Sequence, residues 1–227
     1  MNPRKLTQKL LTKIGARFSP AHIHNLNAAL NYLEVGRWLR ANGFDDSPRY
    51  RTRELLYSAI GSSVGHEKVL YLEFGVYEGY SMRTWSGLLK NPLSSLQGFD
   101  SFEGLPEAWD ARRPKGTFDV KGSVPKFDDT RVRLHQGWFD ETLPSFTLPE
   151  RERLVLNMDA DLYSSTKFVL DTLREEIKPG TIIIFDEFCD RAHELKAFDE
   201  FLQTTGMKFR FVGATETLEH AAFERTR

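Results

Sequence analysis

The sequence predicts an α/β fold in which a mostly parallel sheet carries helices on both faces. From Lys68 onward, short and almost continuously apolar runs alternate with helix-like stretches, the pattern of parallel strands buried on both sides. A chain of 227 residues is long enough for one such domain. The expected strands are KVLYLEF (68–74), LQGFD (96–100), VRLHQ (132–136), LVLNMD (154–159) and TIIIFDEF (181–188).

Residues 1–64 predict a helical extension that precedes the main domain at 65–227. Apolar side chains recur every three to four positions between Leu26 and Leu33, as along one face of a helix. A second helix is expected at 53–60. The loop-like stretch NGFDDSPRY separates the two helices.

The start of this extension is basic and amphipathic. Its first 33 residues carry five Lys or Arg and no Asp or Glu. Leu6, Leu10, Ile14 and Phe18 lie about one helical turn apart, which predicts an apolar helix face. Such a helix packs on the body or on a second subunit, or else it is a transit peptide or a membrane-surface helix.

Within the main domain, helices are expected at 81–89 and 164–177, and Pro179-Gly180 stops the second one. Near the end of the chain, KFRFVGA and AAFERTR predict an antiparallel hairpin at the edge of the sheet. The stretch 105–130 is rich in Pro, Gly and Asp and is too long for a simple connection, so we expect it to shape a binding pocket.

Composition excludes some classes of protein. A net charge of −1 lacks the basic surplus of a general nucleic-acid binder. The single cysteine permits no internal disulfide, which indicates a reducing, cytoplasmic location. No stretch approaches the roughly 20 apolar residues of a membrane-spanning helix.

The turn after the first predicted strand is the first candidate ligand site, because ligands of open parallel sheets bind at the carboxyl ends of the strands. Gly75 and Gly79 occur there, without the G-x-G-x-x-G pattern that binds a dinucleotide. The carboxylates of Glu73 and Glu78 would repel a pyrophosphate. They suit a ligand with a cationic amine beside its carboxylate, such as S-adenosylmethionine. Alternatively, the two glycines serve only close packing of strand and helix.

The next two strand ends add candidate contacts for such a ligand. Asp100 ends the second strand, where a carboxylate can accept hydrogen bonds from both ribose hydroxyls. The alternative is a surface turn residue. After the third strand, Gly137 gives room, and Trp138 or Phe139 can lie against an adenine ring unless these aromatic side chains belong to the core.

Four motifs together resemble the macrocin O-methyltransferase (TylF/MycF-like) group of class I methyltransferases. They are GFDSFEGLPE (98–107), GWFDETLP (137–144), NMDADLYSST (157–166) and IKPGTIIIFDEF (177–188), and the resemblance spans about 68 to 205. It implies a Rossmann-like methyltransferase fold, S-adenosylmethionine as methyl donor, a divalent cation, and a hydroxyl of a sugar or sugar-bearing natural product as acceptor. It also implies a homo-oligomer, taken as a dimer, whose N-terminal segment helps to cover the site.

The predicted donor site combines the strand-end residues with those that the resemblance implies. They are Glu73, Gly75, Val76, Tyr77, Glu78, Gly79, Ser81, Asp100, Ser101, Phe102, Gly137, Trp138, Phe139, Asp159, Asp161 and Tyr163.

Two acidic pairs end neighbouring predicted strands. Asp159 and Asp161 follow one strand, and Asp186 and Glu187 follow the next, so four carboxylates are expected at one edge of the sheet. Clustered like charges need a cation or protons, and an all-oxygen set suits Mg²⁺ first, then Ca²⁺ or Mn²⁺. The alternative is a set of caps and loop salt bridges. The resemblance implies that Asp159, Asp186 and Glu187 bind the metal and that Asp161 supports it or contacts the donor. Glu187 is one carbon longer than the aspartate that the family commonly has at this position.

The predicted chemistry gives the carboxylates a role. A cation that chelates two vicinal hydroxyls orients them and lowers the pKa of the attacking hydroxyl, and a carboxylate then takes the proton. Asp159 and Asp186 are the predicted catalytic residues. His135 and His193 are rival bases, although His135 within a strand suits a structural role and His193 can equally lie on a solvated helix turn.

The function predicted from the sequence is an O-methyltransferase acting on a small-molecule hydroxyl. A related fold that uses the same donor site for hydroxylation and a noncatalytic nucleotide-binding protein are the alternatives. An NAD-dependent dehydrogenase fits less well, because the glycine pattern differs.

Overall fold

The computed structural model describes residues 2–44, 47–110 and 112–227. The chain forms two compact units, Met1–Gly43 and Phe44–Arg227. Asp45 and Asp46 of the expected loop NGFDDSPRY, and Ala111 of the expected irregular stretch, lie outside the described residues. Helix α3 (Arg53–Val64), which falls within the predicted extension 1–64, belongs to the second unit.

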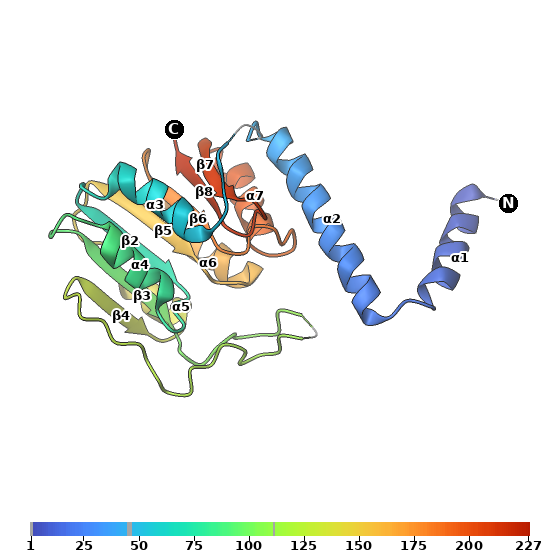
Figure 1. Cartoon of the computed structure of the whole chain (residues 1–227), viewed down its shortest axis with the longest axis horizontal. Coiled ribbons are helices and arrows are strands. Elements are labelled where there is room, and N and C mark those ends of the chain that lie inside the picture. The colour runs from blue at the N-terminus through green and yellow to red at the C-terminus, as the bar shows by residue number, and fades with distance from the viewer. Residues whose placement is uncertain (1, 45–46, 111) are drawn as a thin grey trace. The chain divides into compact units, whose positions relative to one another are not determined.

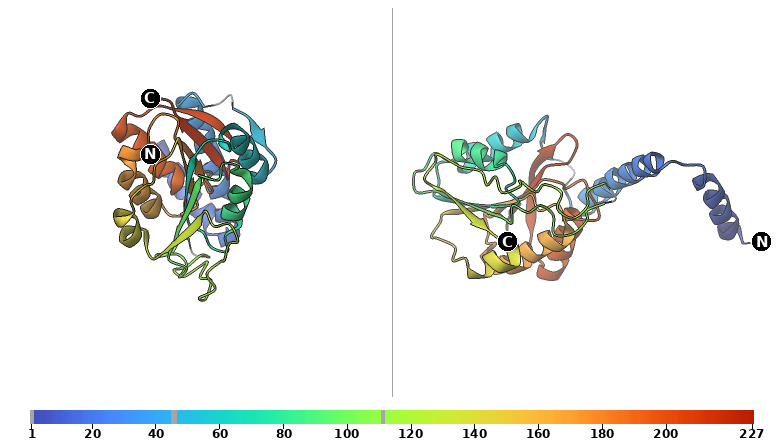
Figure 2. Two further views of the ribbon diagram at one scale, coloured as in Figure 1. Left: turned by 90° about the vertical axis from the view of Figure 1, so that its left-hand side faces the viewer. Right: turned by 90° about the horizontal axis from the view of Figure 1, so that it is seen from below.

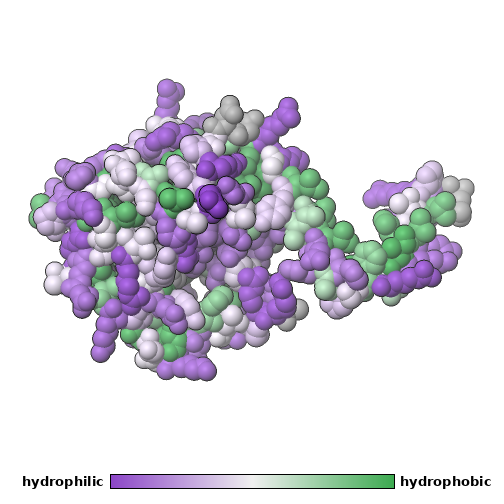
Figure 3. All heavy atoms as spheres, viewed as in Figure 1, coloured by the Kyte–Doolittle hydropathy of each residue, from purple (hydrophilic) through white to green (hydrophobic). Residues whose placement is uncertain are grey.

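The first unit consists of helices α1 (Pro3–Gly15) and α2 (Pro20–Ala41) (Figure 1). Ser19 caps α2, because its hydroxyl accepts a hydrogen bond from the His22 N–H while the His22 ring faces the Ser19 N–H. Hydrophobic side chains follow both helices in Figure 3. The exposed ones on α1 are Leu6, Leu10, Leu11 and Ile14, and those on α2 are Ile23, Leu26, Leu30, Tyr32 and Leu33.

The second unit is built on one sheet with the strand order β1-β7-β8-β6-β5-β2-β3-β4. All neighbouring strands pair in parallel except β8, which is antiparallel to β6 and to β7. The predicted sheet and its terminal hairpin are confirmed, and β1 adds one short strand outside that hairpin. The strands are β1 (Arg49–Tyr50), β2 (Val69–Phe74), β3 (Ser95–Asp100), β4 (Val132–Gln136), β5 (Arg153–Met158), β6 (Ile182–Phe185), β7 (Phe209–Thr215) and β8 (Ala221–Arg225).

Helices cover both faces of this sheet (Figure 1, Figure 2). Helices α3 and α4 (Tyr80–Leu88) pack against each other on one face. On the other face lie α5 (Phe139–Thr142), α6 (Tyr163–Thr172) and α7 (Glu194–Thr205). Short 3₁₀ turns at Leu143–Ser145 and Arg174–Glu176 follow α5 and α6. The helix expected at 164–177 is therefore an α-helix that ends in a 3₁₀ turn.

Aromatic side chains fill the space between the sheet and its helices. On the α3–α4 face, Trp85 lies 5.0 Å from Tyr71 and 5.5 Å from Tyr57 between ring centroids, and all three side chains are fully buried. On the α7 face, Phe198 lies 4.9 Å from both Phe185 and Phe223. Burial of such large apolar side chains on both faces stabilises the sheet.

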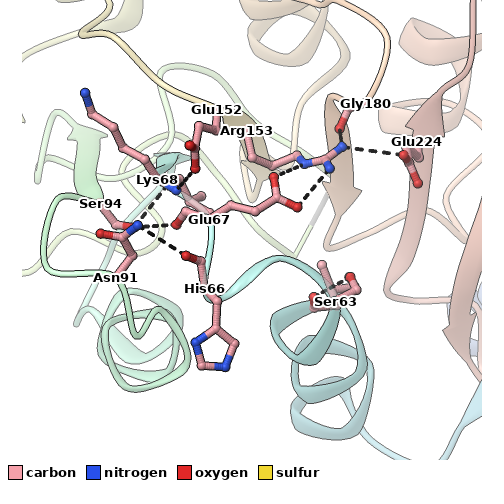
Figure 4. A network of polar contacts seen from close by, with 12 residues as sticks. Ser63, His66, Glu67, Lys68, Asn91, Ser94, Glu152, Arg153, Gly180 and Glu224 are labelled. Atoms are coloured by element: carbon pink, nitrogen blue, oxygen red, sulfur yellow. Dashed lines mark hydrogen bonds and ion pairs between the residues drawn. The ribbon is translucent and has the colours of Figure 1, made fainter.

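The amino ends of β2 and β5 are joined by a polar network (Figure 4). Arg153 donates hydrogen bonds of 2.9 Å to each carboxylate oxygen of Glu67 and one of 2.8 Å to the Gly180 carbonyl. The Glu224 carboxylate lies 3.6 Å from the same guanidinium. Hydrogen bonding to Glu67 raises the pKa of Arg153. The network therefore connects the starts of β2, β5 and β6, opposite the carboxyl ends of these strands.

Replacing Arg153 with methionine should destabilise the protein by about 2 kcal/mol, because the Glu67 carboxylate and the Gly180 carbonyl lose their partner. The free energy of unfolding in urea measures this loss. Ligand binding at the carboxyl ends of the strands should not change. A variant as stable as the wild type would show that water replaces the guanidinium without cost.

Candidate active site

The turn between β2 and α4 depends on glycine. Gly75 has φ +94°, and a Cβ atom built on it would lie 1.8 Å from the Asp159 carbonyl oxygen. Gly79 caps α4 with φ +79°, and a Cβ there would lie 2.6 Å from the Phe127 ring. Only glycine tolerates both the left-handed conformation and these approaches. Both glycines therefore serve close packing, and Gly75 also lines the cavity described below.

Asp100 joins the ends of β2 and β3. Its Oδ2 atom accepts hydrogen bonds from the backbone N–H groups of Val76 (2.7 Å) and Tyr77 (2.8 Å). Its Oδ1 atom accepts one from the Phe102 N–H at 2.6 Å. A carboxylate offers about four acceptor sites, so these bonds leave about one for a ligand hydroxyl. Asp100 is thus a half-buried organiser of two turns rather than a simple surface turn residue.

Three non-glycine residues near the ends of neighbouring strands have left-handed backbone conformations. They are Tyr77 (φ +49°) after β2, Phe102 (φ +59°) after β3 and Asp161 (φ +58°) after β5. Each such residue costs on the order of 1–2 kcal/mol, and strain of this kind concentrates at functional sites. The edge of the sheet formed by these strand ends is therefore the place to search for a ligand site.

A cavity of about 780 Å³ lies at these strand ends, within the usual range for small-molecule sites. The turns after β2 and β3 and the acidic residues after β5 and β6 all contribute to its wall. The predicted residues that line it are Gly75, Tyr77, Asp100, Ser101, Trp138, Phe139, Asp159, Asp161, Asp186 and Glu187. The predicted residues outside the lining are Glu73, Val76, Glu78, Gly79, Ser81, Phe102, Gly137 and Tyr163.

The predicted aromatic residues Trp138, Phe139 and Tyr163 differ in whether they line the cavity. Trp138 and Phe139 are half-buried and line the cavity at the start of α5. The Phe139 ring also meets the core residue Phe74 edge-on, with 5.6 Å between centroids. Tyr163 lies apart, because its hydroxyl donates a 2.6 Å hydrogen bond to Glu200. Trp138 and Phe139 therefore present aromatic surface to a ligand, whereas Tyr163 fixes the start of α6 to α7.

The acidic residues come together as predicted from the strand ends. Burial and repulsion from Asp186 raise the pKa of Asp159 well above its usual range. Burial, with repulsion from neighbouring acids, also raises the pKa of Asp161 to about 7 and that of Glu187 to about 7. Without a cation, burial and mutual repulsion therefore favour the protonated, neutral forms of these carboxyl groups.

A hard cation such as Mg²⁺ fits the chemistry of these carboxylate oxygens as metal ligands. Asp186 Oδ1 is buried without an aligned hydrogen bond, although His220 Nε2 lies 2.7 Å away and Arg53 Nη1 lies 3.8 Å away. The carboxylates that surround it repel one another. Across the described ranges, however, no three Asp, Glu, His or Cys side chains already lie close enough to bind a metal ion. The oxygen ligands are present, and a cation would have to draw them together.

Three residues of this region have no recognisable signal in the sequence: Arg53, His220 and Glu194. Arg53 lines the cavity from the start of α3, and His220 contacts Asp186 from the turn before β8. Glu194 is fully buried at the start of α7, where its Oε2 accepts a 3.0 Å hydrogen bond from the Glu187 N–H. An acidic residue at a helix start is common, so the sequence carried no signal for this contact.

The two rival bases lie outside the cavity lining. His135 Nε2 lies 2.8 Å from Gln97 Oε1, and its ring stacks on Phe99 at 4.5 Å, which suits the structural alternative. His193 Nδ1 accepts a 3.2 Å hydrogen bond from the Tyr163 N–H, and burial lowers its pKa. His193 is thus engaged at the start of α7.

The irregular stretch 105–130 forms one wall of the cavity. Leu105, Trp109, Arg113, Lys115 and Phe118 contribute to the lining. The Arg113 guanidinium lies 3.3 Å from the Trp109 ring centroid and 2.8 Å from Asp110. A 2.6 Å hydrogen bond from Ser164 to Glu107 attaches the same stretch to α6. The stretch therefore shapes the cavity, as expected.

Glu73 lies beneath the cavity, within the sheet. Its side chain is 1% exposed, and the Tyr71 hydroxyl donates a 2.5 Å hydrogen bond to its Oε2 atom. Burial raises the pKa of Glu73 to about 8, against the lowering effect of the Tyr71 hydrogen bond. Near neutral pH the folded chain therefore keeps a proton on Glu73 that the unfolded chain releases.

This difference predicts that the ligand-free protein loses stability as the pH rises from about 4.5 to about 8, the interval between the unfolded and folded pKa values of Glu73. The full interval corresponds to about 5 kcal/mol. Glu73→Gln should make this dependence less steep, measured as the free energy of unfolding at a series of pH values, while the other acids with raised pKa values keep part of it. Glu78→Gln, on the exposed side of the same turn, is the matched control and should leave the slope unchanged. Equal slopes for the wild type and Glu73→Gln would contradict this account.

Comparison with known proteins agrees with the fold, which is that of class I methyltransferases. The solved O-methyltransferase NovP superposes with a TM-score of 0.56 at 26% identity, over 77% of this chain and 78% of that one. The calicheamicin methyltransferase CalS11 shares the fold with a TM-score of 0.61 at 21% identity, over 92% of this chain and 94% of that one. The family model "Macrocin-O-methyltransferase (TylF)" matches residues 62–212, and the chain belongs to this family.

Curated relatives of this chain are named as O-methyltransferases. The tetracenomycin-C rhamnosyl 4'-O-methyltransferase of Streptomyces olivaceus is 30% identical over 141 residues, which cover 52% of each chain. The mycinamicin III 3''-O-methyltransferase of Micromonospora griseorubida is 29% identical over 140 residues, covering 52% of this chain and 54% of the relative. The matches thus span about half the length of these relatives.

Proposed function

We propose that this protein is an S-adenosylmethionine-dependent O-methyltransferase that methylates a hydroxyl group of a small molecule, a sugar or a glycosylated natural product. One observation carries the proposal: a single cavity is lined both by the β2 and β3 turns, which suit the donor, and by the carboxylates after β5 and β6, which suit a polyol acceptor. Family membership and the activities named for the relatives support the same reaction.

In this proposal the donor lies across the ends of β2, β3 and β4. The free acceptor site of Asp100 takes a ribose hydroxyl, and Trp138 or Phe139 lies against the adenine ring. Val76, Gly79 and Phe102 act indirectly by shaping the turns that Asp100 organises. The acceptor then occupies the part of the cavity walled by the stretch 105–130.

We further propose that Asp159, Asp186 and Glu187 bind Mg²⁺, with Asp161 beside them. When bound, Mg²⁺ would lower the pKa of a coordinated hydroxyl and neutralise the repelling acids. Asp159 and Asp186 orient the acceptor oxygen for in-line attack on the sulfonium methyl group, and a carboxylate of the cluster receives its proton. Methyl transfer forms the new C–O bond and releases S-adenosylhomocysteine.

The N-terminal residues 1–64 are proposed to complete the enzyme by covering the site and by forming a homodimer. Support for a contribution of the α3 part of this segment comes from Arg53, which lines the cavity from within the second unit. Support for a dimer comes from α2, where Ile23, Leu26, Leu30 and Leu33 are exposed at the alternating spacing of a two-stranded coiled coil. Leu30→Glu should therefore convert a dimer into a monomer in light scattering, and an unchanged mass would exclude this interface.

We also propose a cytoplasmic location, since the one cysteine suits a reducing compartment. Among the described helices, none combines the length and apolarity needed to cross a bilayer.

Thermal unfolding with added ligands tests the proposed reaction class. S-adenosylmethionine and S-adenosylhomocysteine should each raise the melting temperature, and NAD⁺ should not. Mg²⁺ should raise the melting temperature further. Stabilisation by NAD⁺ alone would favour a dehydrogenase. Donor binding without release of S-adenosylhomocysteine from any glycosylated acceptor would favour a noncatalytic protein, and release of a hydroxylated product would favour the related hydroxylase chemistry.

A further inference from the structure

The proposed donor carries a carboxylate into an acidic cavity. Its methionyl group has an α-amino group and an α-carboxylate, and the latter would be repelled by the acids after β5 and β6. Such a carboxylate needs a cationic partner in the cavity wall. Among the described residues of the lining, the Lys and Arg side chains are Arg53, Arg113 and Lys115.

Arg53 is the cation on the donor side of the cavity. Its guanidinium lies 4.5 Å from the ring centroid of Tyr80, the first residue of α4 after the glycine turn. The same group lies 3.8 Å from Asp186 Oδ1. Arg53 therefore lies between the turn that suits the donor and the acidic end of β6.

The Arg53 guanidinium has unused hydrogen-bonding capacity. Its nearest carboxylate atoms, in Glu54 and Asp186, lie 3.5 Å and 3.8 Å away, too far or too poorly aligned for a hydrogen bond. Its side chain is 30% exposed, so much of it is already removed from water. Five guanidinium donors arranged as a fork match the two oxygens of a carboxylate.

Arg113 and Lys115 are less suited than Arg53 to bind the donor carboxylate. Arg113 is engaged with Asp110 and with the Trp109 ring. Both Arg113 and Lys115 belong to the stretch 105–130, on the wall assigned to the acceptor. Neither is attached to the turn between β2 and α4.

We propose that Arg53 binds the α-carboxylate of the methyl donor through a bidentate charge-assisted hydrogen bond. The inference rests on the proposed function, because it takes S-adenosylmethionine as the ligand. Arg53 then separates the donor carboxylate from Asp186 and orients the methionyl end beside Gly75. The helix that opens with Arg53 thereby contributes directly to donor recognition.

The test compares two donors that differ only in the carboxylate. Calorimetric titration with S-adenosylmethionine and with decarboxylated S-adenosylmethionine gives the affinity ratio for each variant. Wild type should prefer the carboxylated donor by about 10- to 100-fold. Arg53→Met should reduce this ratio to near one. Lys115→Met, which removes a cation from the other wall, should keep it.

Other outcomes overturn the inference. If Arg53→Met weakens both donors equally, Arg53 acts only as a counterion of Asp186. If the variant keeps the wild-type ratio, another group binds the carboxylate. If Arg53→Met does not fold, Arg53→Lys provides the comparison: it keeps the charge without the fork, so its ratio should fall partway, and an unchanged ratio overturns the inference. If the wild type binds neither donor, the proposed function fails together with the inference. If the wild type binds the donors and only the Arg53 result is contrary, the inference fails alone.

Discussion

Replacing Gly75 with alanine is expected to destabilise the protein by about 3 kcal/mol or more and to abolish donor binding. A Cβ atom at this position would lie 1.8 Å from the Asp159 carbonyl oxygen, and the residue has φ +94°. Because the obstacle is backbone, no side-chain rotation relieves it. The turn and the strand end that carries Asp159 must then move apart. Urea denaturation measures the stability, and titration with S-adenosylhomocysteine measures the binding.

Gly87 provides the matched control for this substitution. It lies near the end of α4, and a Cβ atom there would meet no atom within 4 Å. Gly87→Ala should therefore stabilise the protein by about 0.5–1 kcal/mol, because alanine favours the helix more than glycine does. Wild-type stability and affinity in Gly75→Ala would show that the approach of the two strand ends is not a requirement of the site.

Asp159→Asn is expected to lower turnover by about 10²- to 10⁴-fold while leaving donor affinity nearly unchanged. Asp159 follows β5, which lies between β2 with its glycine turn and β6 with Asp186. An amide is a weaker metal ligand than a carboxylate and cannot act as a base. The stabilising effect of Mg²⁺ in thermal unfolding should disappear in the variant. Initial rates with saturating donor and acceptor, together with melting curves with and without Mg²⁺, measure both effects.

Asp128→Asn is the control for Asp159→Asn. Asp128 is exposed and does not line the cavity, so the same chemical change there should alter neither rate nor Mg²⁺ response. Full turnover in Asp159→Asn would remove Asp159 from the reaction. Lost turnover with an intact Mg²⁺ effect would place the metal elsewhere.

The core strands could be predicted because their composition leaves little choice of environment. Every residue of β2 and β6 is buried, so runs that are apolar throughout or, in β2, interrupted only by Glu73 identify them without knowledge of their neighbours. Strand β1 could not be predicted. It has two residues, and it becomes a strand only through pairing with β7 at Ala214 and Thr215. A tertiary contact of this kind leaves no periodic pattern in the sequence.

In the candidate site, too, some residues could be placed from the sequence and others could not. Asp159 and Asp186 could be placed together, because β5 and β6 pair in parallel and both residues follow the strand ends. The contacts of Arg53 and His220 with Asp186 depend on how α3 and the β7–β8 turn fold over the sheet. The three hydrogen bonds that the Asp100 carboxylate accepts from backbone N–H groups depend on the geometry of the turns. The strands and the residues at their ends follow from the pattern of the sequence, whereas these side-chain contacts follow from tertiary packing.

The central claim is that the cavity at the carboxyl ends of β2, β3, β5 and β6 binds the methyl donor. A crystal structure of the protein with S-adenosylhomocysteine tests it most directly. The account predicts the ribose beside Asp100, the adenine against Trp138 or Phe139, and the homocysteine carboxylate on Arg53. A ligand bound at another surface, or a cavity closed by its own side chains at saturating ligand, would contradict it.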